Sequence, residues 1–189
     1  MPALTRQFWA AARMLLIATV ALGVLYPFAG LLVAAALPNQ ARGSLIEVDG
    51  QTVGSRLIGQ AYPGQGWFQP RPSAPEYDAL ASGASNLGPN NPDLVALIGE
   101  RRRTVAAREG VAPEQVPADA VTASASGLDP GISPAFAQLQ VARVARETGI
   151  DPAQLRRMID DATVVPALGV LGETWVNVQD LNLAVARAQ

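Results

Sequence analysis

Carboxylates, tyrosines, arginines and hydroxyls are the side chains with which this 189-residue chain could do chemistry. It has no Cys and no His, and all 14 of its basic residues are Arg. The sequence therefore lacks the groups for a thiol nucleophile, a zinc knuckle, a Ser-His-Asp triad, a Schiff base or a P-loop lysine. This inventory argues against an autonomous enzyme.

Paired carboxylates would be the main route to catalysis in such a chain, as in glycosidases, which place two acids across a cleft. Glu47 and Asp49 lie close in sequence, but their segment is typical of a β-hairpin. Most other acids fall at expected caps, turns and helix surfaces. A membrane-tethered carboxylate hydrolase, with Asp129 and Glu173 as the acids to test, stays as an alternative hypothesis.

The formal net charge of −2 argues against nucleic acid as a partner, because such proteins carry a basic stripe. The one basic cluster, Arg101–Arg103, follows Glu100 in a stretch with helical periodicity. We interpret it as a solvated helix face.

A charge-free stretch from Met14 to Leu37 predicts a transmembrane helix, about 36 Å long against a hydrocarbon core of about 30 Å. The alternative is a signal peptide cleaved after Ala36, which would release a secreted binding module. The apolar core of a signal peptide runs roughly 7–15 residues and is shorter than this stretch, which also contains Tyr26-Pro27. An uncleaved anchor is the favoured interpretation.

Arginines near the ends of this span predict its orientation. Arg6 and Arg13 precede it with no acid beside them, whereas only Arg42 follows closely. We expect residues 1–13 in the cytoplasm, 14–37 in the membrane and 38–189 outside as one extracytoplasmic, periplasmic domain.

The expected span has one face of small residues, spaced by three or four and so on one side of a helix. Such a face lets a partner helix approach closely, and Pro27 removes the hydrogen bond to the Gly23 carbonyl and predicts a kink. The face indicates docking in a larger membrane complex. Its members are Thr19, Gly23, Pro27, Gly30 and Ala34.

The remainder predicts an α+β domain with a small sheet. Three helices are expected to begin with a cap residue followed by Pro, and the first two to end at glycines. A hairpin, a β-leaning segment and a final strand supply the sheet, and a short helix closes the chain. The starts are Asn91, Ser133 and Asp151, the ends Gly110 and Gly149, the strands 45–48, 51–53, 120–127 and 174–178, and the closing helix 181–188.

The apolar side of the first of these helices is expected to carry Leu94, Val95, Leu97, Ile98 and Val105. A long Gly/Pro/Ser-rich region, 61–92, precedes it. Its embedded aromatic residues favour an ordered loop over a disordered linker. At the junction between this loop and the helix that begins at Asn91, we interpret the sequence as an ordinary helix cap. An anion-binding site at this helix N-terminus is the less favoured alternative.

Six segments in order carry a family pattern: GSRLIGQ (54–60), WFQPRPSA (67–74), SGASNLGPNNP (82–92), VTASASGLDPGISP (121–134), QVARVA (140–145) and LGETWVNVQDLNLA (171–184). With the N-terminal span, they resemble the C subunit of Kdp-type potassium-transporting P-type ATPases. The resemblance implies a non-catalytic subunit of a bacterial inner-membrane complex. Its expected partners are an ATP-hydrolysing subunit, a channel-like potassium-translocating subunit, a small accessory subunit and membrane lipid.

The resemblance also implies an external domain over the channel-like subunit, and a catalytic chaperone that raises the ATP affinity of the ATPase subunit. An external domain cannot touch cytosolic ATP, so that effect would have to pass through the membrane helices. We therefore expect no directly bound cofactor, ATP on the partner subunit and K⁺ as the transported ion.

The resemblance supplies no catalytic residue and no metal ligand. It implies a His after Leu128-Asp129-Pro130, where this chain has Gly131, so an imidazole role there cannot be general. Seven polar residues within the matched segments are candidates for a buried network or an interface. They are Arg71, Asn86, Asp129, Gln140, Arg143, Glu173 and Asn177.

Overall fold

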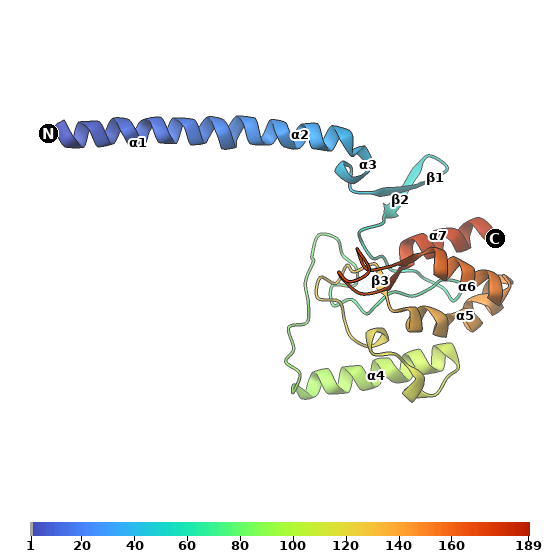
Figure 1. Ribbon diagram of the computed structural model, residues 1–189. Helices are drawn as coiled ribbons and strands as arrows, with labels where there is room; N and C mark the ends of the chain where they lie inside the picture. The colour runs from blue at the N-terminus through green and yellow to red at the C-terminus, as the bar shows by residue number, and fades with distance from the viewer. Residues whose placement is uncertain (1) are drawn as a thin grey trace. The chain divides into compact units, whose positions relative to one another are not determined.

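The computed structural model describes residues 2–189, which form two compact units, one ending at Ser44 and the other Leu45–Gln189 (Figure 1). The first consists of helices, and the second combines helices with two small antiparallel sheets. The predicted α+β class with one N-terminal apolar helix is confirmed.

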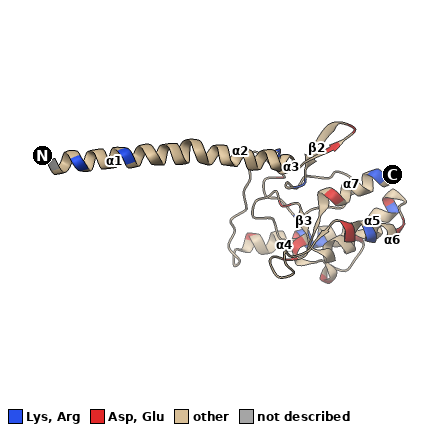
Figure 2. Ribbon diagram, turned by 45° about the horizontal axis from the view of Figure 1, so that its top comes forward, with Lys and Arg blue, Asp and Glu red and all other residues tan. Residues whose placement is uncertain are grey.

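The first unit runs through α1 (Pro2–Val20), a π-helical turn (Ala21–Leu25) and α2 (Tyr26–Ala36) as one continuous helix, followed by the short α3 (Pro38–Ala41). Figure 2 shows basic but no acidic residues along α1. Its Ala3–Ala36 stretch is long and apolar enough to cross a membrane. A signal sequence near the N-terminus would meet the same criterion.

Just before Pro27, where a kink is predicted, the helix contains a π turn (Ala21–Leu25). The Tyr26 N–H donates to the Ala21 carbonyl, five residues back instead of four. A π turn rearranges the backbone hydrogen bonds just ahead of the proline ring, where a regular α-helix would leave a carbonyl without its donor. The helix therefore continues through Pro27 instead of ending there.

The second unit begins with the predicted hairpin, β1 (Leu45–Val48) paired with β2 (Gln51–Ser55). Asp49 and Gly50 both have positive φ, 51° and 76°, as a tight two-residue hairpin turn requires. Glu47 and Asp49 are thus explained by the hairpin.

The predicted helix boundaries agree closely with α4 (Pro92–Glu109), α5 (Pro134–Thr148) and α6 (Pro152–Asp161). The side chains of the predicted caps accept the first free backbone N–H groups, and Gly110 and Gly149 end α4 and α5 in the left-handed region. Two short 3₁₀ turns, Pro113–Gln115 and Ala118–Ala120, connect α4 to the sheet region.

The three-stranded sheet has the order β3-β5-β4, with β3 at Gly131–Ile132, β4 at Thr163–Val164 and β5 at Trp175–Asn177. The prediction of a strand within 120–127 is wrong. Serine side chains satisfy the backbone there instead, since the Ser124 hydroxyl accepts from the Gly127 N–H at 3.1 Å.

The closing helix α7 (Val178–Ala188) begins three residues earlier than predicted. The Asn177 side chain explains this, because its Oδ1 accepts from the N–H groups of Gln179 and Asp180.

The core lies between α5, α6, α7 and the sheet and includes Phe68 from the long loop, so this aromatic residue anchors its part of the loop to the domain. The buried residues of α4 all lie in its C-terminal half, and the predicted burial of Val95 is wrong: it is 62% exposed. The central buried side chains are Phe68, Phe136, Val144, Leu155, Val176 and Leu181.

Candidate functional site

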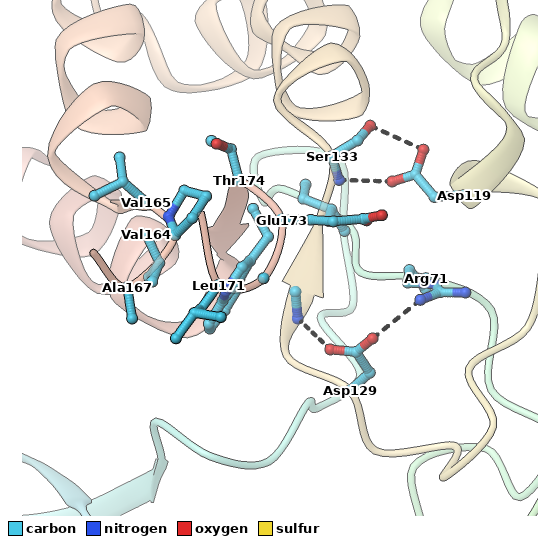
Figure 3. Close-up of a pocket in the computed structure, with 15 residues that line it drawn as sticks. Arg71, Asp119, Asp129, Ser133, Val164, Val165, Ala167, Leu171, Glu173 and Thr174 are labelled. Atoms are coloured by element: carbon cyan, nitrogen blue, oxygen red, sulfur yellow. Dashed lines mark hydrogen bonds and ion pairs between the residues drawn. The ribbon is translucent and has the colours of Figure 1, made fainter. Parts of the chain in front are cut away.

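An open pocket of about 550 Å³ lies against the three-stranded sheet and is lined by side chains of two chemical kinds. Figure 3 shows Val164, Val165, Ala167 and Leu171 on one side and charged residues on the other. The charged residues come from the loops before β3 and β5 and from the long loop. They are Arg71, Asp119, Asp129 and Glu173.

Arg71 and Asp129 form an ion pair, with 3.1 Å between Arg71 Nη1 and Asp129 Oδ2. The other oxygen of Asp129 accepts from the Gly131 N–H at 2.8 Å, and the Arg71 guanidinium also donates to the Thr122 carbonyl. The Asp129 carboxylate is thus held by a cation and a backbone donor, one on each of its oxygens.

A tyrosine fixes the backbone that carries Arg71. The Tyr77 hydroxyl donates to the Arg71 carbonyl, and burial raises the pKa of Tyr77 to about 12, against the opposing charges of Arg108 and Arg101. Tyr77 therefore remains a neutral donor at physiological pH.

Asp119 is engaged by the start of α5. Its two carboxylate oxygens accept from the Ser133 N–H at 2.7 Å and from the Ser133 hydroxyl at 2.9 Å. The same hydroxyl accepts from the Phe136 N–H and caps the helix. Asp119 thus supports the cap, and among residues 2–189 it forms no ion pair with a cationic side chain.

Glu173 is the one exposed acid of the pocket with no hydrogen bond or ion pair recorded within the described chain. Three carboxylates and one guanidinium line the pocket, which gives a formal charge of −2 (one minus three). The carboxylates of Asp119 and Asp129 are committed to structural donors, so this arrangement does not supply the free acid–base pair that a glycosidase requires.

Gly131 forms part of the floor beneath the Trp175 ring. A Cβ at this position would lie 2.8 Å from Trp175 Cε3 and 3.1 Å from Asp129 Oδ1. Any side chain at position 131 would therefore have to displace the Trp175 indole. Glycine is the residue that fits beneath this ring.

Three of the predicted residues, Gln140, Arg143 and Asn177, belong to a second group of polar residues, which lies in the interior and holds the main chain of residues 56–69. We call this group the buried polar cluster. Its members are Glu109, Gln140, Arg143, Asn177, Gln179 and Asn182, all buried.

Two of its amides each pair with the N–H and the carbonyl of one residue, as the opposite residue of an antiparallel strand does. Asn182 accepts from the Phe68 N–H and donates to the Phe68 carbonyl, both at 2.9 Å. Gln140 accepts from the Gln69 N–H at 2.7 Å and donates to the Gln69 carbonyl at 3.1 Å. These side chains satisfy buried backbone groups that no strand covers.

Two further amides fix the start of the segment. Asn177 donates to the Arg56 carbonyl at 3.0 Å, and Gln179 donates to the Ile58 carbonyl at 2.7 Å. The segment that follows the hairpin is therefore anchored at both ends by side chains of α5, α7 and the residue before α7.

Arg143 and Glu109 add a buried ion pair, 2.9 Å from Nε to Oε2, with side chains at most 1% exposed. The guanidinium also donates to Gln140 and to the carbonyls of Gln65 and Trp67. Burial lowers the pKa of Arg143, while the hydrogen bond and charge of Glu109 raise it. Full hydrogen bonding makes this charge tolerable inside the domain.

The structure thus divides the seven predicted residues. Arg71, Asp129 and Glu173 line the pocket, Gln140, Arg143 and Asn177 belong to the buried polar cluster, and Asn86 lies exposed in the long loop with a φ of 53°.

Comparison with known proteins assigns a family to this chain. The family model described as "K+-transporting ATPase, c chain" (KdpC) matches residues 8–187. The chain belongs to this family.

Relatives named "Potassium-transporting ATPase KdpC subunit" agree. One from Kineococcus radiotolerans is 51% identical over 187 residues, covering 98% of this chain and 95% of its own length. One from Cereibacter sphaeroides is 49% identical and covers 88% and 89%, and one from Xanthomonas oryzae pv. oryzae is 47% identical and covers 79% and 72%.

Family resemblance did not single out Asp119, Glu109, Gln179 or Asn182. Asn182 had a readable signal, because it interrupts the buried series Val178, Leu181 and Val185 of α7. Nothing in the sequence marked Glu109 as buried, since an acid before a helix-ending glycine is expected to be solvated. Among residues 2–189 no group of three or more acidic side chains converges as metal ligands would.

Proposed function

We propose that this chain is a non-catalytic accessory subunit of an ATP-driven, high-affinity potassium import complex, in which a partner subunit carries out catalysis. The observation that carries the proposal is the family match over residues 8–187. The absence of Cys, His and Lys and the structural engagement of Asp119 and Asp129 support it. K⁺ is then the transported ion.

The proposed topology places the subunit in a bacterial inner membrane as a single-pass protein. Residues 1–13 lie in the cytoplasm, 14–37 span the membrane, and 38–189 lie in the periplasm. The basic residues Arg6 and Arg13 support this orientation. Mass spectrometry of the mature N-terminus separates it from cleavage after Ala36, since an anchored subunit keeps its first residues.

The small-residue face of the span is proposed to contact a partner helix. Gly23 and Thr19 are neighbours on the helix surface, since a Cβ on Gly23 would lie 4.0 Å from Thr19 Cγ2. A Cβ on Gly30 would meet nothing within 4 Å, which leaves room for another helix. Pro27 and Ala34 continue this face.

Replacing both glycines, Gly23→Leu with Gly30→Leu, tests this docking. We expect roughly tenfold less of the subunit to co-purify with the ATPase and channel-like subunits, with a matching loss of potassium uptake at micromolar concentrations. The control is Ala21→Leu with Ala29→Leu, each about half a turn away from a member of the face. Unchanged co-purification of the glycine variant would contradict the proposed face.

An influence on the ATP affinity of the ATPase subunit is proposed to pass through the membrane helices as a coupling between states. The glycine variant should then raise the KM for ATP in complexes that retain it, while the control variant leaves KM unchanged. Equal KM values for ATP in the glycine variant and the control variant would mean that this face supports assembly and does not affect ATP affinity.

A further inference from the structure

The pocket between the apolar loop and the charged residues has properties that the proposed function leaves unused. The apolar loop, residues 163–172, contains no charged residue, although Asp161 and Glu173 flank it. Its tip is strongly exposed, with Leu168 at 90% and Val170 at 80%. An exposed apolar patch beside a polar rim is typical of a protein or membrane interaction site.

The loop is held in shape by its own backbone. Ala167 and Leu171 exchange two hydrogen bonds of 3.0 Å across a turn in which Leu168 and Gly169 have positive φ. Binding to a loop with a fixed shape costs less ordering entropy than binding to a mobile one.

The opposite side of the pocket carries excess negative charge. Asp119 and Asp129 are engaged by backbone donors, and Figure 3 shows Glu173 extending between Asp119 and Arg71. The formal charge of −2 over these side chains is complementary to a cation (one Arg against three acids).

We propose that this pocket binds a basic side chain, Arg or Lys, carried by an apolar segment of another protein subunit. The aliphatic stem would lie along Val164, Val165 and Leu171, with the Trp175 ring near the cation, and the charged head would reach Glu173. The inference rests on the proposed membership of a multi-subunit complex.

Other cations fit less well. A lipid ammonium group brings its own phosphate, which the carboxylates would repel. The apolar side of the pocket offers no ligand to a free metal ion. In addition, no metal-binding group of three or more acidic side chains is found among residues 2–189.

Because the chain has no Cys, Val170→Cys gives the full-length subunit a single thiol for a benzophenone cross-linker at the loop tip. In membranes containing the whole complex, we expect light to produce an adduct with another subunit of that complex. The linked peptide should contain Arg or Lys. Adducts with lipid alone, or no adduct, would overturn the proposal.

A charge reversal tests the acidic side of the pocket. Adding Glu173→Arg should reduce the adduct roughly tenfold, whereas Glu114→Arg, at an exposed acid outside the pocket, should not. An adduct unaffected by Glu173→Arg would overturn the proposal. Near-UV circular dichroism, which reports on all three tryptophans of the chain, checks that both variants fold alike.

The unlabelled wild-type subunit separates this proposal from the proposed function. If it co-purifies with the other subunits while the adduct is absent, the pocket proposal alone fails. If it does not co-purify, the proposed function fails as well.

Discussion

The buried polar cluster and the pocket use similar side chains under opposite conditions. In the cluster, Arg143 is 1% exposed and every polar partner lies within the domain. In the pocket, Glu173 is exposed and unpaired within the described chain, and the acids outnumber the single arginine.

This difference separates structural from binding roles. A buried polar group without a partner costs free energy, so the cluster must be complete within the chain. An exposed carboxylate is solvated at little cost and remains available to a partner. A polar side chain whose partners all lie within the domain therefore indicates a structural role. An unbalanced charge beside an apolar surface indicates a site that binds a partner.

Breaking the ion pair of the cluster should have the largest effect. Arg143→Met removes one of the two guanidinium partners of the buried Glu109 carboxylate, which keeps its 2.7 Å ion pair with Arg108. It also leaves the carbonyls of Gln65 and Trp67 without their donor, so the free energy of unfolding should fall by about 3–5 kcal/mol. Urea unfolding of the full chain in detergent, followed by near-UV circular dichroism, measures this. Arg146→Met is the control, because Arg146 is exposed and should change stability by less than about 0.5 kcal/mol. Equal losses in both variants would refute a structural role for the pair.

Removing one strand-like amide should have an intermediate effect. Asn182→Leu keeps the branching and number of side-chain heavy atoms but leaves the Phe68 N–H and carbonyl without partners, at an expected cost of about 2–3 kcal/mol. Hydrogen exchange of the Phe68 amide should accelerate. Gln154→Leu, on the exposed side of α6, serves as the control. Normal protection of Phe68 in Asn182→Leu would mean that the backbone finds other partners.

Filling the floor of the pocket should have the smallest of the three effects. Gly131→Ala forces the Trp175 ring to move and should cost about 1–2 kcal/mol, with a change in tryptophan fluorescence. Gly88→Ala is the matched control, since a Cβ there meets no atom within 4 Å. If Gly131→Ala leaves fluorescence and stability unchanged, the indole does not depend on the glycine.

Local patterns explain which parts of the fold were predictable. The hairpin follows from Asp49-Gly50, and three helix starts follow from a cap residue before Pro. The segment 120–127 was predicted as a strand because small and β-branched residues are common in strands. Its serine hydroxyls instead accept hydrogen bonds from nearby backbone N–H groups and stabilise turns.

The pocket and the cluster depend on contacts far apart in sequence. Asn182 meets Phe68 across 114 residues, and Arg71 meets Asp129 across 58. Resemblance to a family marked several of these residues as polar members of matched segments. It did not tell which of them pair with one another, because pairing depends on how helices and loops pack.

The sequence by itself determined the apolar N-terminal helix, the α+β class and most element boundaries, because periodicity, capping and composition act over short stretches of chain. The family followed from the resemblance of six ordered segments. Only the tertiary structure decided that Gln140, Arg143 and Asn177 are enclosed while Arg71, Asp129 and Glu173 surround an open pocket. The physical reason is burial: the same polar side chain is costly or available according to whether packing removes it from water.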